Sequence, residues 1–261
     1  MGRLIWGLLW LMTGSLVAQP LATAKVDQPA TPSLDRYGNL YLSDQAGNIH
    51  KYDPQGQFLL NFSPPRPGAI ALLESWNTVK ILVFYKVFQR FMIMDRFLTQ
   101  VPYFDFDPMS VGFARVATLA ADENVWLIDD GDFSLKKFNP RLKKLENSTP
   151  LDLVLDAREY DVRFAREYQN QLYLADYRSG ILVFDNLGSY RKKIALDSVD
   201  YFSFLGDELY TFKGNQLSFF HLYSFEERKI NLPHEGVKYA LVTDQKLILC
   251  YPDRVEWWAK P

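Results

Sequence analysis

Residues 38–54, GNLYLSDQAGNIHKYDP, decide the fold of this chain. They contain two short, mainly apolar runs, Leu40–Leu42 and Ile49–Tyr52, joined by a polar turn with Gly and Asn. Such runs, bounded by Gly, Asn, Asp and Pro, are typical of β-strands joined by tight turns. Residues 170–185, NQLYLADYRSGILVFD, repeat the pattern. A hairpin of one design therefore occurs at least twice, which indicates a fold built from repeats.

Four weaker copies keep the apolar pattern and lose much of the polar signature. All six copies align on one large apolar residue in the second strand of the hairpin, here called the marker residue. The marker residues are Tyr52, Met94, Phe138, Phe184, Phe220 and Trp258. They recur at intervals of about 40 residues, the spacing of propeller blades. Because burying such a side chain stabilises a protein by about 1.5–3 kcal/mol, we expect all of them to lie in the core.

The repeats predict an all-β fold, a six-bladed β-propeller with four-stranded blades, as a single domain over residues 25–261. The third strand of the last repeat ends near Ala259, so its outer strand must come from elsewhere in the chain. We expect Val26–Ala30 to supply it, which closes the ring and removes exposed strand edges. Pro29 suits an outermost strand, where one row of backbone groups faces solvent.

Residues 1–18, MGRLIWGLLWLMTGSLVA, have the layout of a secretory signal peptide: a basic start, a short apolar run, then small and polar residues. Cleavage is expected after Ala18, or after Ala24 in the sequence Ala22-Thr23-Ala24, and an uncleaved anchor is the alternative. No later segment has the roughly 20 apolar residues of a membrane helix. A lone cysteine, Cys250, leaves no internal disulfide. We therefore expect an exported protein, in the bacterial periplasm or secreted or associated with the outer membrane.

Composition excludes several classes of function. Basic and acidic residues number 29 and 31, so the net charge of −2 gives no electrostatic reason to bind nucleic acid. One cysteine and three histidines make a cysteine- or histidine-based metal centre unexpected. The chain contains no phosphate-binding Gly-Lys-Ser/Thr loop and no Gly-x-Ser-x-Gly element. We therefore expect no cofactor and no catalytic residues.

At motif level, residues 38–59 and 170–188 resemble the repeat of NHL-type and TolB-like six-bladed propellers, which read Gly-Asn-apolar-Tyr, then Asp, a turn, an aromatic residue and Asp-Pro. The resemblance implies the architecture and no particular activity, because this fold hosts binding proteins and enzymes alike. The alternative function is a metal-dependent hydrolase of the gluconolactonase type, or a small-ligand or glycan binder using the central channel. Glu74-Ser75-Trp76 is the nearest string to the gluconolactonase motif and lacks its Gly-Pro.

Acidic residues recur in the turns. Asp44, Asp129 and Asp176 share one repeat position, where a bond from the side chain to nearby backbone is the expected role. Asp129-Asp130-Gly131-Asp132 has the oxygen ligands of a Ca²⁺ site but not the EF-hand pattern, and a solvated turn is the favoured interpretation. A basic hairpin at Lys136, Lys137, Arg141, Lys143 and Lys144 is expected to face solvent.

Together these observations predict an exported, non-catalytic propeller that acts as a protein-binding scaffold subunit of the bacterial cell envelope. Its partner is another envelope protein or complex, and peripheral association with the outer membrane would act through that partner. We expect the binding surface to be formed by the turns between the second and third strands of each repeat, since rigid folds present binding residues on loops. The candidate residues are Asp44, Gln45, Asn48, Tyr85, Lys86, Asp130, Asp132, Tyr177, Arg178, Lys213, Asn215, Tyr251 and Arg254.

Overall fold

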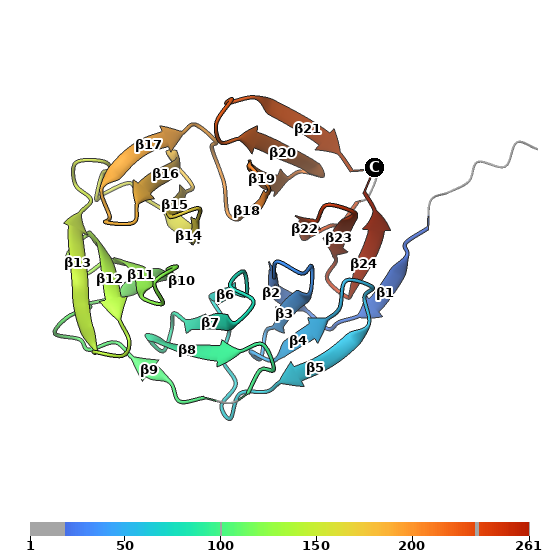
Figure 1. The fold of residues 1–261 in the computed structure, drawn as a ribbon, viewed down its shortest axis with the longest axis horizontal. Coiled ribbons are helices and arrows are strands. Elements are labelled where there is room, and N and C mark those ends of the chain that lie inside the picture. The colour runs from blue at the N-terminus through green and yellow to red at the C-terminus, as the bar shows by residue number, and fades with distance from the viewer. Residues whose placement is uncertain (1–18, 100, 233–234, 261) are drawn as a thin grey trace, which may run out of the picture.

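A computed structural model describes residues 19–99, 101–232 and 235–260. In it, six four-stranded antiparallel sheets stand in a ring, so the expected six-bladed propeller is confirmed (Figure 1). The segment predicted to be a signal peptide, residues 1–18, lies outside the described residues. Within those residues, no helix is long and apolar enough to cross a membrane.

Each blade contributes one strand to each of four concentric rows. The innermost strands are β2 (Pro29–Leu34), β6 (Leu72–Glu74), β10 (Ala114–Leu119), β14 (Val162–Tyr168), β18 (Phe202–Leu205) and β22 (Tyr239–Val242). The second strands are β3 (Leu40–Asp44), β7 (Lys80–Tyr85), β11 (Val125–Asp129), β15 (Gln171–Asp176), β19 (Glu208–Lys213) and β23 (Lys246–Cys250). The third strands are β4 (Ile49–Tyr52), β8 (Arg90–Asp95), β12 (Ser134–Asn139), β16 (Gly180–Asp185), β20 (Gln216–His221) and β24 (Arg254–Ala259). The outer strands are β5 (Phe58–Phe62), β9 (Phe104–Asp105), β13 (Lys144–Pro150), β17 (Tyr190–Ile194), β21 (Glu227–Asn231) and β1 (Ala22–Lys25).

We number the blades 1 to 6 in chain order, from the sheet of β2–β5 to the sheet of β22–β24 with β1. The core lies between the blades, because both faces of every sheet pack against a neighbour. Leu82 and Phe84 of β7 belong to a cluster shared with blade 3, while Ile81 and Val83 belong to one shared with blade 1. This two-sided burial explains why the second strands are almost continuously apolar rather than alternating.

The marker residues occupy one structural position, as the repeat predicts. Each pairs with the first apolar residue of the second strand, for example Leu40 with Tyr52 and Leu172 with Phe184. Five of the six are buried and Trp258 is partly buried. The repeat alignment is therefore confirmed in all six blades.

An N-terminal strand does close the ring, but it is not the expected one. β1 pairs with β24 from Ala22 opposite Trp257 to Lys25 opposite Arg254, whereas residues 26–28 form no strand. The prediction that Val26–Ala30 completes the last blade was therefore wrong. Pro29 instead begins β2, the innermost strand of blade 1, beside a bulge. A proline is tolerated there because an innermost strand has a ladder partner on one side only.

Candidate binding surfaces

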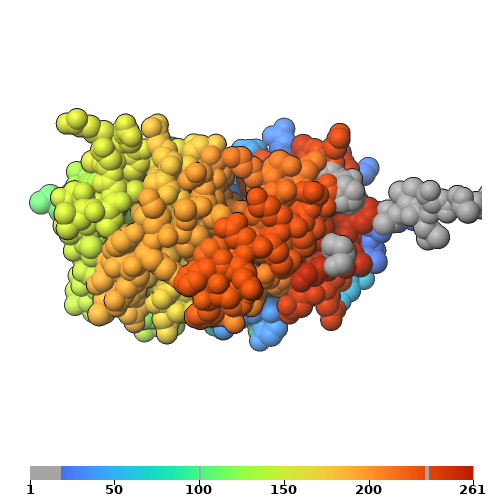
Figure 2. Space-filling model, turned by 90° about the horizontal axis from the view of Figure 1, so that it is seen from above, coloured from blue at the N-terminus to red at the C-terminus, as the bar shows by residue number. Residues whose placement is uncertain are grey.

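Seen edge-on, the molecule is a flattened disc with two broad faces (Figure 2). We call the upper face the one formed by the turns between second and third strands and by the connections from one blade to the next. The lower face is formed by the turns between first and second strands and between third and fourth strands. Because successive strands are antiparallel, the chain crosses from one face to the other with every strand.

All of the predicted binding residues lie on the upper face, spread over six blades. Gln45, Asp132, Arg178 and Lys213 are exposed, and most of the others are half-buried. Tyr85 and Tyr251 are exceptions, since they are buried at the ends of β7 and β23. The ring of Tyr85 lies 5.8 Å from that of Tyr103, and Tyr251 lies 4.0 Å beneath the Arg254 guanidinium. These two tyrosines support the turns and present little surface to a partner.

The aspartates at the shared repeat position bind backbone, as expected. In Asp44, Oδ1 accepts hydrogen bonds from the N–H groups of Ala46 and Asn48, both at 2.9 Å. Asp176 accepts from Asp161 N at 2.6 Å and from Ser179 N at 2.9 Å. The second residue of each pair lies within the following turn, so these aspartates fix the shape of the upper-face turns.

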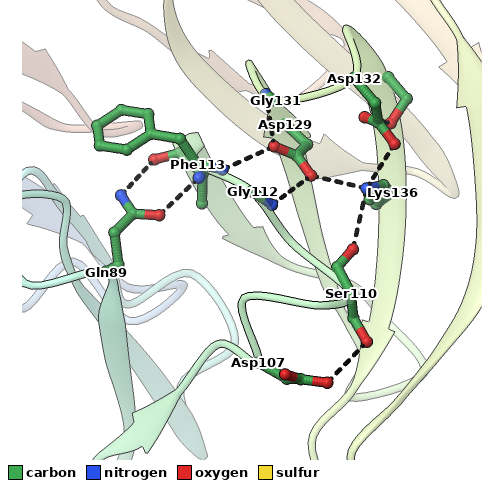
Figure 3. Close-up of polar contacts among 11 residues, drawn as sticks. Gln89, Asp107, Ser110, Gly112, Phe113, Asp129, Gly131, Asp132 and Lys136 are labelled. Atoms are coloured by element: carbon green, nitrogen blue, oxygen red, sulfur yellow. Dashed lines mark hydrogen bonds and ion pairs between the residues drawn. The ribbon is translucent and has the colours of Figure 1, made fainter.

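Asp129 organises a larger cluster, in which two chain segments meet (Figure 3). Its carboxylate accepts hydrogen bonds from the N–H groups of Gly112, Phe113 and Gly131 at 2.8–2.9 Å. The Lys136 Nζ atom lies 2.6 Å from Oδ2 of the same carboxylate and forms an ion pair with it. A Cβ atom on Gly131 would lie 2.9 Å from the Gly112 Cα atom, so the approach of the two segments requires glycine. The cluster therefore ties the connection between blades 2 and 3 to the β11–β12 turn.

The other two carboxylates of this turn, those of Asp130 and Asp132, also have side-chain partners. Lys136 reaches Asp132 at 2.7 Å, and Asp130 accepts from Arg115 at 2.7 Å and from Tyr160 at 2.6 Å. No group of three metal-ligating side chains occurs among the residues that the structure describes. Lys136 is buried, as is Lys137, which pairs with Asp122 at 2.6 Å. The expectation that both lysines face solvent was wrong, because the Ser110 carbonyl, from the connection before blade 3, covers Lys136, and the Asn186 carbonyl of blade 4 covers Lys137.

The Asp129 cluster predicts a pH-dependent stability. Burial by itself would raise the pKa of Asp129, but the hydrogen bonds from Lys136 and three backbone N–H groups outweigh it and hold the pKa below the usual 3.8. A carboxyl with a lowered folded-state pKa stabilises the protein at neutral pH, and the contribution is lost as the pH falls from about 4 through the folded-state value. We expect Asp129→Asn to lower the free energy of unfolding by about 1.5–3 kcal/mol at pH 7.

Urea unfolding of wild type and Asp129→Asn between pH 3 and pH 7 tests this effect. The difference between the two proteins should shrink toward pH 3, because the Asp129 carboxyl of the unfolded wild type gains a proton there and the folded state loses its advantage. Asp27→Asn is the matched control, since Asp27 is exposed and has no ion-pair partner among the described residues. A difference that stays constant over this pH range would contradict the prediction.

The upper face also carries an exposed apolar patch that the sequence analysis missed. Val87, Met109 and Leu153 are 82%, 93% and 91% exposed, and Phe88 and Phe113 are 47% and 39% exposed. All lie in the β7–β8 turn or in the connections on either side of blade 3. The Gln89 side chain bonds Ala114 N at 2.6 Å and Ala114 O at 2.9 Å, which joins two of these segments (Figure 3). Apolar residues within otherwise polar turns were the signal that could have revealed this patch.

Cations lie beside this apolar patch, at the upper mouth of the central channel. Lys86, Arg115 and Arg163 line a cavity of about 180 Å³. Arg115 pairs with Asp130 and Arg163 with Asp161, but Lys86 has no carboxylate within ion-pair distance among the described residues. Its Nζ atom lies 5.9 Å from the centre of the Phe113 ring. Burial and the charge of Arg115 lower the pKa of Lys86, and the more distant carboxylates of Asp130 and Asp161 offset part of this decrease. An anionic group from another molecule would relieve this unpaired charge.

The central channel is closed near its middle. One register position of the innermost strands is occupied by Ser33, Glu74, Thr118, Arg166, Ser203 and Leu241, here called the hub layer. All of these side chains are at most 4% exposed. Arg166 of blade 4 reaches Glu74 of blade 2 at 2.6 Å and the Ser203 hydroxyl of blade 5 at 2.8 Å. Because this ion pair crosses the hub, a ligand can occupy one mouth of the channel but cannot pass through it.

Cys250 behaves as expected for a structural thiol. It is fully buried, and burial raises its pKa to about 12. Since the thiolate is the reactive form, this cysteine is inert at neutral pH.

Comparisons with known proteins support the fold and no closer relationship. No protein-family model matches the chain, and no curated protein matches it by sequence. The Neurospora crassa Pan2 WD40 domain aligns with a TM-score of 0.67 at 8% identity, over 93% of this chain and 95% of that one. Virginiamycin B lyase from Staphylococcus aureus, in an inactive form with quinupristin, aligns with a TM-score of 0.63 at 11% identity, over 92% and 99%. BamB from Moraxella catarrhalis aligns with a TM-score of 0.53 at 13% identity, over 90% and 86%.

At these identities the similarity shows the fold alone. The chain is a six-bladed β-propeller, and its motif-level resemblance to NHL-type and TolB-like repeats stays a prediction. A WD40 domain and an enzyme both occur among the similar structures, so the fold by itself does not distinguish binding from catalysis.

Proposed function

We propose that this protein is an exported, non-catalytic β-propeller that binds another protein of the bacterial cell envelope through its upper face. The observation that carries the proposal is the apolar patch around Lys86, formed by Val87, Phe88, Met109, Phe113 and Leu153. Exposed apolar side chains gathered in one sector, next to polar turns, are typical of protein-binding surfaces. The exposed apolar residues of the lower face, such as Tyr37, Phe97, Leu142 and Leu187, are instead distributed around the ring.

The charges of the patch indicate what the partner presents. Lys86 is partly buried and has no carboxylate within ion-pair distance among the described residues. Its neighbours Arg115 and Arg163 already have carboxylate partners. Placing one carboxylate beside Lys86 would compensate its charge, and Val87 and Phe113 would contact apolar groups on either side. We therefore expect the partner to insert an acidic side chain flanked by apolar residues, because complementary charge sets both register and specificity.

Crosslinking in the native envelope followed by affinity purification tests the docking surface. We expect Val87→Asp with Met109→Asp to reduce recovery of the partner by about tenfold or more, since charge replaces apolar contact area at the centre of the patch. Tyr223→Asp is the control, because Tyr223 is also an exposed apolar side chain but lies in a lower-face turn. Equal recovery with both variants would overturn the proposed surface, and a parallel pair, Tyr177→Ala with Arg178→Ala, tests whether blade 4 takes part.

Export is the second part of the proposal, and it rests on residues 1–18. We infer cleavage after Ala18, because β1 begins at Ala22 and cleavage after Ala24 would remove three of its four residues. N-terminal sequencing of the protein recovered from the periplasm of a bacterial host should therefore begin at Gln19. A first residue at Lys25 would contradict this. Any association with the outer membrane would act through the partner.

A further inference from the structure

A separate cavity opens on the lower face, opposite the proposed docking surface. It measures about 300 Å³ and is bordered by blades 1, 2, 5 and 6, with Ser203 of the hub layer at its floor. Because the Ser203 hydroxyl accepts a hydrogen bond from Arg166, the cavity ends at the closed layer. A smaller cavity of about 160 Å³ adjoins it and shares Arg36 and Trp76. The volume lies at the lower end of the range for small-molecule sites.

An aromatic wall runs from this lower-face cavity into the adjoining smaller one, because Trp76 lines both, Phe204 lines the larger and Tyr168 lines the smaller. Trp76 meets Tyr168 edge to face, with ring centres 5.5 Å apart. Tyr168 stacks on Phe204 at 4.0 Å and 7°. The Tyr168 hydroxyl donates to the Gly206 carbonyl at 2.7 Å, which holds the ring in place. Trp76 and Tyr168 are only half-buried, and Trp76 lines both cavities whereas Tyr168 lines the smaller one.

Two charged side chains at the rim of the cavity have no partner among the described residues. The exposed Arg36 guanidinium lies 5.6 Å from the Trp76 ring centre and makes no hydrogen bond within the described part of the chain. The exposed Asp244 carboxylate has no ion-pair or hydrogen-bond partner in that part of the chain either. Asp35, by contrast, accepts from Tyr37 N and Asn39 N at 2.9 Å, which fixes the turn that carries Arg36.

We propose that this lower-face cavity binds a saccharide ring. A sugar presents an apolar C–H face that packs on Trp76, whose ring Tyr168 supports, and its hydroxyls both donate and accept hydrogen bonds. It therefore satisfies Arg36, which only donates, and Asp244, which only accepts. A ligand with a single charge would be attracted by one of these two groups and repelled by the other, whereas the hydroxyls of a neutral sugar can bond both. An aromatic side chain would use the wall and leave both rim groups unpaired.

Titration with neutral trisaccharides (maltotriose, cellotriose and chitotriose), followed by tryptophan fluorescence and by calorimetry, tests the site. We expect at least one of them to bind saturably below about 10 mM. Trp76→Ala should weaken that binding by about tenfold or more, and Arg36→Ala and Asp244→Asn by about threefold or more each. Arg36→Ala and Asp244→Asn change exposed side chains, so they leave the fold intact even if Trp76→Ala does not. Tyr190→Ala, on the outer strand β17, is the matched aromatic control and should bind as wild type does.

Failure of all three trisaccharides to bind at 10 mM would overturn the proposal. Binding that is unchanged in Arg36→Ala and Asp244→Asn would also overturn it, as would tighter binding of an aromatic dipeptide, Phe-Phe amide, than of any sugar. The upper-face variant Val87→Asp with Met109→Asp should bind the sugar normally, so this test and that of the docking surface fail independently.

Discussion

Arg166→Ala is expected to lower the free energy of unfolding by about 3–5 kcal/mol, one of the two largest effects we predict. The substitution leaves the Glu74 carboxyl buried and without its charge partner at the centre of the ring. It also removes the hydrogen bond to the Ser203 hydroxyl. An unpaired charge in the interior is costly because it has lost its hydration without gaining a counter-charge. In a domain of this size, the midpoint of thermal unfolding should fall by roughly 6–20 °C.

Chemical and thermal unfolding of wild type and three variants separates the contribution of the ion pair from that of packing. Arg166→Met combined with Glu74→Leu removes both charges and should be nearly as stable as wild type, since a buried pair can be replaced by apolar residues of similar volume. The single variants Arg166→Met and Glu74→Leu should each be far less stable than the double variant. Equal stability of the single and double variants would contradict the role given to the hub layer.

Deletion of residues 19–25, which removes β1, is expected to destabilise the propeller by about 3–5 kcal/mol. The β1–β24 hydrogen bonds contribute about 0.5–1.5 kcal/mol each. Trp257, fully buried beneath Ala22, would become accessible, and such a side chain contributes about 1.5–3 kcal/mol. The row of backbone groups along β24 would also become an open edge, which favours pairing with a second chain. We therefore expect self-association in addition to lower stability.

Urea unfolding and light scattering at several protein concentrations measure both effects. The control is deletion of residues 19 and 20 alone, which precede β1 and belong to no strand. That shorter deletion should unfold as wild type does and remain monodisperse to the same degree. A full deletion that behaved like its control would show that β1 does not hold the ring closed.

The repeat pattern was sufficient to predict the architecture because it is local. The marker residues Tyr52 and Phe184 and their strand partners lie within one hairpin, so neighbours in the chain determine their pairing. Ring closure could also be predicted, since an open blade leaves strand edges exposed. The segment that closes the ring could not be predicted, because Pro29 is compatible with either an outermost or an innermost strand, both of which have one unpaired side. The structure assigns it to β2.

The candidate surfaces were only partly visible in the sequence. Turns such as Asp44–Asn48 could be assigned to one face because strand order determines it. Burial of Tyr85 and Lys136 could not be predicted, because Tyr103 and the Ser110 carbonyl, which cover them, come from other connections of the chain. The exposure of Val87 and Met109 was missed because an apolar residue next to a strand is expected to lie in the core. Only the folded structure shows that no other segment covers these two side chains.

By itself, therefore, the sequence determined the blade, the number of blades and the face on which each turn lies, since these follow from the number of repeats and from hydrogen bonding between residues close in the chain. Only the tertiary structure decided what lies at the axis and at the two mouths. Glu74 and Arg166 are separated by 92 positions, and Trp76 meets Tyr168 from another blade. Contacts of this kind arise because ring closure brings six innermost strands to one axis, and no local pattern encodes which side chains meet there.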